Sequence, residues 1–453
     1  PDSHHLGMRF WRWNGAEGIC KRLRASILSF FFCSYIFIVL IMADDFGYEC
    51  IGANGGNYQT PHIDKLAEEG IRFEHCHSNP LSTPSRVQLM TGKYNVHNYV
   101  AFGKLDRGED TFGNILKNAG YATCIAGKWQ LGKEKDSPKH FGFDTSCLWQ
   151  QTASAVDEQG HDTRYANPVM DINGETIEYP QGTFGPDISC DFVLDFIKRH
   201  KESPFFVYYP MALTHCPFVS TPDSEEWSPM RSPTYKGNAV HFPDMVEYTD
   251  KLVGRILKQL DELQLRDNTL IIFTGDNGTD SPVISMLNGK PYPGGKGKTI
   301  DSGTHVPLIV SCPQGEKGKV NKELIDFTDF LPTLCDVAGI NRPTTPETDG
   351  KSFYPQLYGK KTEARKWIYC WYAPRQVYDE KATVFARDRK YKLYRSGEFY
   401  DIENDFYEKS PITKPNMTGK QKKIFKALQT VINKYEDAAK KKIKFQKKPF
   451  TIE

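Results

Sequence analysis

Short apolar runs that end in polar residues constrain the fold more than any other feature of this sequence. The clearest is residues 35–42, which is almost wholly aliphatic or aromatic and is followed closely by Asp44 and Asp45. Similar runs occupy residues 121–126, 204–209, 268–274 and 308–310. Apolar runs without polar alternation are typical of strands buried on both faces of a parallel sheet. The sequence therefore predicts an α/β fold with a central, mostly parallel sheet.

Helical patterns lie between these runs and a different pattern follows them. Residues 186–199 and 244–263 repeat apolar side chains at helical spacing, and Thr60, Pro61 and Gly70 are typical of a helix start and stop. Asn173-Gly174 predicts a hairpin in the loop 165–186. After a Pro- and Thr-rich linker at 343–350, short alternating segments predict a small antiparallel sheet, with a terminal helix at 420–439 packed on it. We expect three parts: residues 1–34, 35–345 and 346–453.

Composition narrows the class of partner. The 453 residues are 39% hydrophobic and 25% charged, as expected for a folded protein, and the net charge of +2 argues against nucleic acid as a partner. The Lys-rich run at 440–448 is local and is read as a solvated tail. The eleven cysteines include no Cys-x-x-Cys pair, which argues against a zinc ribbon, and their odd number precludes complete internal pairing.

The N-terminal region combines a basic stretch with an apolar one. Basic residues are frequent in residues 8–24, and residues 25–42 are apolar, a pattern that fits either a signal peptide or a membrane span. Because residues 35–42 also read as a buried strand, we assign 1–34 as an export segment or anchor. This division predicts a secreted or periplasmic protein without a stable membrane partner.

The stretch from residue 79 to 92 carries the strongest local signal for chemistry. Thr83 is a suitable helix cap, Pro84 suits the first helical position and Gly92 suits the stop. Ser82 would then lie just before a helix N-terminus, where free backbone N–H groups favour an anion, with Arg86 one turn further on. An ordinary capped helix with an exposed serine explains the local pattern equally well.

Two pairs of hard oxygen donors follow predicted strands. Asp44 and Asp45 come directly after the first strand, and Asp276 and Asn277 follow the strand at 268–274. Adjacent carboxylates repel each other unless a cation compensates, and Ca²⁺ or Mg²⁺ prefers such oxygen ligands. A solvated turn is the alternative for either pair taken alone.

These motifs together resemble those of a known family. Ser82-x-Pro84-Ser85-Arg86, followed by Leu-Met-Thr-Gly-Lys-Tyr at 89–94, resembles the signature of the type I sulfatases, arylsulfatase-like enzymes of the alkaline phosphatase superfamily. Lys128 lies in a Gly-Lys-Trp-Gln-Leu-Gly segment, His215 in a His-x-Pro segment and Lys296 in a Gly-Gly-Lys-Gly segment, all similar to family motifs and in the same order. Two positions depart from the pattern: Gln130, where many members have histidine, and His305, where arginine is frequent.

The resemblance implies a fold, a cofactor and a set of roles. It implies an alkaline-phosphatase-like sandwich in which a maturation enzyme converts Ser82 to formylglycine, and a Ca²⁺ or Mg²⁺ ion bound by Asp44, Asp45, Ser82, Asp276 and Asn277. Arg86 would stabilise the aldehyde hydrate, Lys128 and Lys296 would neutralise the sulfuryl group, and His215 would protonate the leaving alcohol. Gln130 and His305 would contact the substrate.

The implied activity is hydrolysis of sulfate monoesters, with a sulfated carbohydrate or glycan as substrate. Two alternatives stay open at this point. One is a phosphate or phosphonate ester hydrolase of the same superfamily. The other is a sulfoglycan-binding protein without catalysis, in which Ser82 stays unmodified and Gln130 marks the loss of activity.

Overall fold

The structure, a computed structural model, describes residues 35–340, 348–361, 363–375 and 379–446. The proposed export segment, residues 1–34, lies outside the described residues, and so does the boundary proposed near residue 345. That boundary therefore stays a prediction. Within the part of the chain that the structure describes, no helix is long and apolar enough to cross a membrane.

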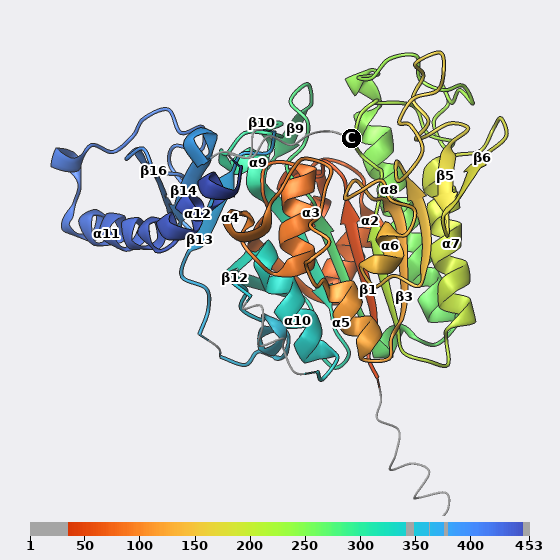
Figure 1. The fold of residues 1–453 in the computed structure, drawn as a ribbon, viewed down its shortest axis with the longest axis horizontal. Helices are drawn as coiled ribbons and strands as arrows, with labels where there is room; N and C mark the ends of the chain where they lie inside the picture. Colours follow the sequence, from red (N-terminus) through yellow and green to blue (C-terminus); the bar gives the residue numbers. More distant parts are fainter. Residues whose placement is uncertain (1–34, 341–347, 362, 376–378, 447–453) are drawn as a thin grey trace, which may run out of the picture. The chain divides into compact units, whose positions relative to one another are not determined.

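A ten-stranded sheet forms the centre of the fold, in the order β12-β2-β11-β8-β1-β7-β3-β4-β5-β6 (Figure 1). Its strands are β1 (Phe37–Ala43), β2 (Ile71–His77), β3 (Ala122–Lys128), β4 (Thr145–Trp149), β5 (Val169–Ile172), β6 (Glu175–Glu178), β7 (Phe205–Pro210), β8 (Thr269–Gly275), β11 (His305–Ser311) and β12 (Lys319–Asp326). The pairs from β8 through β1, β7 and β3 to β4 are parallel, whereas β11 is antiparallel to both of its neighbours. The predicted α/β class with a mostly parallel sheet is confirmed.

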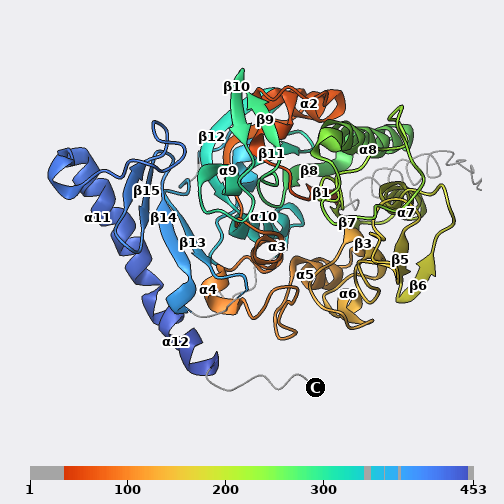
Figure 2. The ribbon, with the colours of Figure 1, turned by 90° about the horizontal axis from the view of Figure 1, so that it is seen from above.

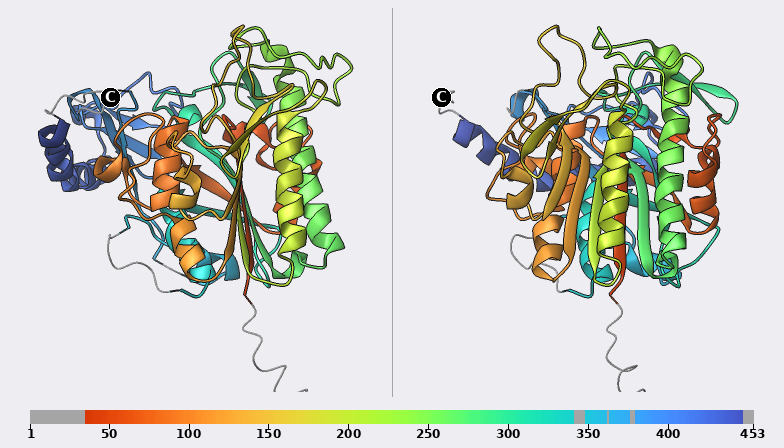
Figure 3. Two further views of the ribbon diagram at one scale, coloured as in Figure 1. Left: turned by 45° about the vertical axis from the view of Figure 1, so that its right-hand side comes forward. Right: turned by 90° about the vertical axis from the view of Figure 1, so that its right-hand side faces the viewer.

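Helices cover both faces of this sheet, as Figures 2 and 3 show. One face carries α3 (Ser82–Thr91), α5 (Phe112–Asn118) and α10 (Phe330–Val337), and the other carries α2 (Pro61–Glu68), α7 (Gly185–Arg199) and α8 (Phe242–Glu262). Strand β1 supplies both cores: Ile38, Leu40 and Met42 pack on one side, and its alternate residues pack on the other. Burial on both faces explains why its sequence is apolar without alternation.

Shorter elements connect these layers. The remaining helices of the main unit are α4 (Asn95–Asn98), α6 (Ser137–His140) and α9 (Asp301–Thr304), and a hairpin joins β9 (Ile284–Leu287) to β10 (Lys290–Pro293). The 3₁₀ helices are Tyr48–Cys50, Gly52–Asn54, Ala239–His241, Arg266–Asn268, Phe327–Asp329, Tyr354–Tyr358, Asp379–Lys381 and Lys414–Asn416. The predicted hairpin is confirmed: Asn173 and Gly174 join β5 to β6 with positive φ angles of 52° and 88°.

The C-terminal part contains the predicted antiparallel sheet. Its strands are β13 (Ile368–Tyr372), β14 (Thr383–Arg387), β15 (Tyr391–Tyr394) and β16 (Phe399–Asp401). The predicted terminal helix at 420–439 is confirmed, and a break at Tyr435 divides it into α11 (Gly419–Lys434) and α12 (Glu436–Gln446). Tyr435 is buried and its ring stacks on Tyr369 at 4.3 Å, a contact that local sequence does not signal.

Candidate active site

The nucleophile candidate opens a buried helix. Helix α3 begins at Ser82 itself, so the predicted cap at Thr83 is wrong; Thr83 lies inside the first turn, and its hydroxyl accepts a hydrogen bond from the Gly103 N–H at 3.1 Å. Gly92 ends the helix in the left-handed region, with φ 66°, as predicted. Ser82 is 2% exposed, so its hydroxyl lies at the positive end of a helix rather than in bulk water.

Parallel pairing brings the two pairs of donors together. Ala43 of β1 lies opposite Gly275 of β8, so Asp44 and Asp276 leave the sheet at the same level. The Asp45 N–H donates to Asp276 Oδ1 at 2.9 Å, and the Asn277 amide donates to Asp45 Oδ1 at 2.8 Å. One carboxylate oxygen from each of Asp44, Asp45 and Asp276 lies within 4.8 Å of the others. Asp45 adopts φ 56°, a costly conformation for an aspartate that is typical of functional sites.

Ser82 lies at the edge of this carboxylate cluster. Its Oγ is 3.1 Å from Asp44 Oδ1 and 3.3 Å from Asn277 Oδ1, and it accepts a hydrogen bond from Lys128 Nζ at 3.2 Å. Lys128 also forms a 2.6 Å ion pair with Asp44. The hydroxyl group of Ser82 therefore contacts two acceptor oxygens, of Asp44 and Asn277, and the ammonium group of Lys128.

Arg86 reaches the cluster from the next turn of α3. Its NH2 donates to Asp276 Oδ2 at 3.0 Å and lies 3.6 Å from Asp44 Oδ1, while its NH1 donates to the carbonyl of Lys128 at 3.2 Å. The guanidinium thus links the strand ends that carry Asp44, Lys128 and Asp276. Arg86 therefore holds the site together and also adds positive charge to it.

Lys296 and His215 complete the group on the far side of Asp45. Lys296 forms an ion pair with Asp45, and His215 Nε2 lies 3.8 Å from Asp45 Oδ2. The Gly297 N–H donates to the Pro80 carbonyl at 2.7 Å, which ties the Lys296 loop to the loop before Ser82. Nine of the predicted site residues therefore lie in one cluster: Asp44, Asp45, Ser82, Arg86, Lys128, His215, Asp276, Asn277 and Lys296.

One residue of the site was not predicted. Arg164 is buried, and its NH1 contacts His215 Nδ1 at 2.6 Å and the Cys216 carbonyl at 2.5 Å, while its guanidinium lies 4.0 Å over the Trp149 ring. Nδ1 of His215 also lies 2.6 Å from the Cys216 carbonyl, which can only accept, whereas Arg164 can only donate. In the tautomer in which Nδ1 accepts from Arg164, the proton of the neutral ring is on Nε2, where His215 can act as a proton donor toward Asp45. Arg164 lies in an irregular loop, and nothing in the local sequence signals this role.

The pKa values of the site residues are shifted by burial and by the neighbouring charges. Burial raises the pKa of Asp276 to about 7, and the neighbouring Asp44 charge adds to that rise although Arg86 opposes it. Burial would also raise the pKa of Asp44, but Lys128, His215 and Arg86 together hold it well below its usual value. Burial also lowers the pKa of His215 well below its usual value, assisted by Lys296 and Arg164, so its ring is neutral at pH 7. Three clustered carboxylates and the Asn277 amide oxygen suit Ca²⁺ or Mg²⁺.

The two remaining predicted residues are placed differently. Gln130 follows Lys128 in the same loop with φ 54°, and its Oε1 is buried without a hydrogen-bond partner among the described residues. His305 begins β11, where its ring contacts Asp301, stacks on Tyr48 and lies beside His77. Its ring contacts therefore lie in a second histidine cluster, and its predicted contact with substrate stays a prediction.

Sequence comparison identifies the family to which these motifs belong. The sulfatase family model matches residues 37–340, which include every residue of the cluster. The chain belongs to the sulfatase family. A second model, N-sulphoglucosamine sulphohydrolase, C-terminal, matches residues 296–436. The predicted family, a type I sulfatase of the alkaline phosphatase superfamily, is thereby confirmed.

Individual sulfatases are similar to this chain in sequence, and a solved structure is similar to it in fold. Human N-acetylgalactosamine-6-sulfatase is 29% identical over 355 residues, 71% of this chain and 65% of that protein. N-acetylgalactosamine-6-O-sulfatase of Bacteroides thetaiotaomicron is 29% identical over 412 residues, 73% of this chain and 78% of that protein. A solved structure in complex with its substrate, D-glucosamine-2-N,6-O-disulfate, matches with a TM-score of 0.70 and 24% identity, over 89% of this chain and 98% of that one. This chain thus spans just under two thirds of the length of the human sulfatase.

Proposed function

We propose that this protein hydrolyses sulfate monoesters of carbohydrates. The observation that carries the proposal is the convergence on Ser82 Oγ of Asp44, Asn277 and Lys128 from the ends of three different strands, β1, β8 and β3, all within 3.3 Å. Membership of the sulfatase family supports the reaction, and the similarity to N-acetylgalactosamine-6-sulfatases supports a sulfated sugar as substrate.

The charge of the cluster supports an anionic group as ligand. Arg86, Lys128 and Lys296 balance the three carboxylates Asp44, Asp45 and Asp276, so a bound divalent cation would leave the site with net positive charge. A sulfate monoester carries one negative charge, and a phosphate monoester carries more near neutrality. Both would be attracted, and direct comparison of their turnover is therefore part of the test.

Each residue has a role that its position permits. Lys128 and Lys296 would bind the oxygens of the sulfuryl group; one such aimed donor is worth about 3–4 kcal/mol of barrier. His215, with its proton on Nε2, would donate that proton to the leaving alcohol. Arg86 would hold Asp276 and the Lys128 backbone in place.

Two groups absent from the structure fit this site. Ca²⁺ or Mg²⁺ would be held by Asp44, Asp45, Asp276, Asn277 and the residue at 82, where it would polarise a sulfate oxygen. Formylglycine at position 82 would supply, as its hydrate, two hydroxyl groups on one carbon, of which one attacks sulfur and the other later releases sulfate. The buried position of Ser82 beside Lys128 and Asp44 suits both hydroxyls. A maturation enzyme is then a required partner.

The test combines mass spectrometry with kinetics. Protein co-expressed with a serine-competent maturase should contain a carbonyl-reactive peptide that includes position 82, and turnover of sulfate esters should rise with the modified fraction. Ser82→Ala should abolish turnover but retain substrate binding, because Lys128 and Lys296 remain. Multiple turnovers at full rate by unmodified protein would contradict the formylglycine mechanism, and faster turnover of a matched phosphate ester would favour the phosphoesterase alternative. Ligand binding without any turnover by modified protein would favour a binding protein.

We also propose that the protein acts outside the cytoplasm. The basic and then apolar pattern of residues 8–34 supports export. The described residues include nine cysteines, and all of them are buried. Cell fractionation of the native host tests the proposal, and recovery in the cytoplasm alone would contradict it.

A further inference from the structure

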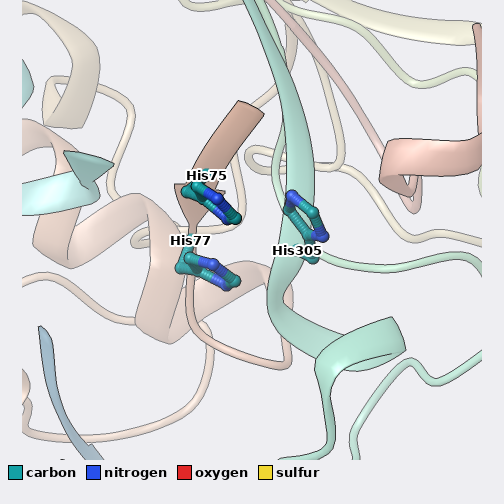
Figure 4. Close-up of side chains that lie close together, drawn as sticks. All are labelled: His75, His77 and His305. Carbon is teal, nitrogen blue, oxygen red and sulfur yellow. The ribbon is translucent and has the colours of Figure 1, made fainter. Parts of the chain in front are cut away.

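Three histidines form a second cluster, away from the carboxylates. His75 and His77 are two residues apart on β2, so they project from the same face of that strand, and His305 of β11 is the register partner of His77. Figure 4 shows the two rings of β2 directed toward the ring of His305 across the gap between the strands. One ring nitrogen from each histidine lies within 4.8 Å of the other two.

His77 points to a ligand in this gap. Its side chain is 1% exposed, and its Nε2 has no hydrogen-bond partner among the described residues. An unpaired buried ring nitrogen costs free energy unless something binds it. Its Nδ1 lies 3.4 Å from Thr304 Oγ1 and 3.3 Å from Arg387 NH1. Nε2 has its lone pair available for a ligand when Nδ1 donates its proton to Thr304 and Arg387 donates to Asp301 instead of Nδ1.

His305 has the support that a metal-bound histidine usually has. Its Nδ1 lies 3.3 Å from Asp301 Oδ2, and its Nε2 lies 2.9 Å from the Glu74 carbonyl. A carboxylate that accepts the Nδ1 proton orients the ring and makes Nε2 a stronger ligand. Arg387 lies 3.3 Å from His77 Nδ1, and its charge is offset by an ion pair with Asp301. The positive charge of Arg387 therefore lies on the Nδ1 side, away from Nε2 of His77.

We propose that His75, His77 and His305 form a zinc site, separate from the carboxylate site. Three imidazoles suit Zn²⁺, which takes them at about 2.0–2.1 Å and leaves a fourth position for water. Such bonds bring the nitrogens to about 3.4 Å from one another, so small side-chain rotations suffice, with His305 exchanging its Glu74 contact for the metal.

The position of the cluster gives the cation a structural consequence. Strand β2 runs directly into the loop before Ser82, and β11 follows the segment that carries Lys296. The Ser78 N–H donates to the Thr304 carbonyl at 2.9 Å, so the two segments already touch. A zinc ion would link the same two segments through the adjoining pair, His77 and His305, and should raise the thermal stability of the protein.

The experiment measures metal binding in the full chain. Protein freed of metal by chelation and then saturated with Ca²⁺ is titrated with Zn²⁺ by calorimetry, and with Co²⁺ while its visible absorption is recorded. We expect one equivalent of Zn²⁺ per chain and a Co²⁺ spectrum typical of four-coordinate nitrogen ligation. His75→Gln, at the half-buried member, should weaken binding at least about tenfold, because one of three ligands is lost. His161→Gln, in a loop beside Asp157, is the matched control and should bind normally.

Two results would overturn the zinc site. One is unchanged Zn²⁺ affinity and stoichiometry in both His75→Gln and His305→Gln. The other is the absence of a Zn²⁺ binding event in calcium-saturated wild type. Because binding is read without turnover, and Ser82→Ala should retain it, failure of this proposal is distinct from failure of the proposed sulfatase activity.

Discussion

Arg164 is expected to act on catalysis only through His215. Replacement by methionine removes the donor that contacts Nδ1 at 2.6 Å and leaves the ring free to place its proton on either nitrogen. The fraction of His215 with a proton on Nε2, directed at the leaving group, then falls. Arg164→Met should therefore slow a reaction that needs protonation of the leaving alcohol and spare one that does not.

The expected size follows from the contacts that are lost. General acid catalysis is worth about 10²–10⁴-fold, and loss of orientation without loss of the histidine should cost about 10²-fold in kcat, or about 2.7 kcal/mol. The fold should also lose about 2–4 kcal/mol, since the carbonyl of Cys216 and Nδ1 of His215 both lose a charged donor. KM should change little, because Arg164 is not among the groups proposed to bind the sulfuryl group.

Two substrates separate this role from a merely structural one. The assay compares an unactivated alkyl sulfate of a sugar with an activated aryl sulfate, whose leaving group needs no proton. Arg164→Met should lose about 10²-fold on the first and less than about threefold on the second. The double variant with His215→Asn should be no slower on the alkyl ester than His215→Asn alone, because the two residues act as one unit. Arg231→Met, which removes a different part-buried arginine bound to Asn167 and Asp157, is the control and should affect both esters equally little.

An equal loss on both esters would refute the reasoning. Arg164 would then support the loop rather than the proton on His215. An unchanged rate on the alkyl ester would show that His215 is not the acid, or that its tautomer is set by another group.

Three further results are expected. Chelation should abolish sulfate-ester turnover, and added Ca²⁺ or Mg²⁺ should restore it. Asp276→Asn should not be rescued at ordinary metal concentrations, because it removes a carboxylate from the cluster. Full activity of a verified metal-free sample would exclude a role for the metal. Gln130→Ala should lower kcat less than about threefold, because the buried Oε1 has no protein partner among the described residues, and a large loss in kcat at constant KM would instead reveal a transition-state contact. Glu49→Gln should become more stable relative to the wild type as the pH rises. Burial raises the pKa of Glu49 from 4.5 to about 7, so the free energy of unfolding of the wild type falls between those pH values by up to about 3 kcal/mol. Glutamine cannot ionise, so the variant does not lose this stability. Denaturant unfolding from pH 4 to 8 measures that difference, and parallel pH profiles for the two proteins would contradict it.

The sequence by itself determined the class of fold and the strands β1, β3, β7, β8 and β11. Runs such as residues 35–42 are apolar throughout because both faces of β1 are buried. Burial on both faces can therefore be recognised from the local sequence alone. Parallel strands bring their carboxyl ends to one edge, which is why Asp44, Lys128 and Asp276, at the ends of β1, β3 and β8, meet there. The motif around Ser82 and the order of the motifs that follow it indicated the family.

Only the tertiary structure decided which side chains act on those residues from elsewhere in the chain. Arg164 reaches His215 from a loop 51 residues away, and His75 and His77 meet His305 only because β2 pairs with β11, an antiparallel neighbour that strand patterns do not specify. Packing likewise set the start of α3 at Ser82, since the Thr83 hydroxyl binds the Gly103 N–H instead of capping the helix. Hydrogen bonds between distant segments depend on three-dimensional placement, and local propensity carries no record of it.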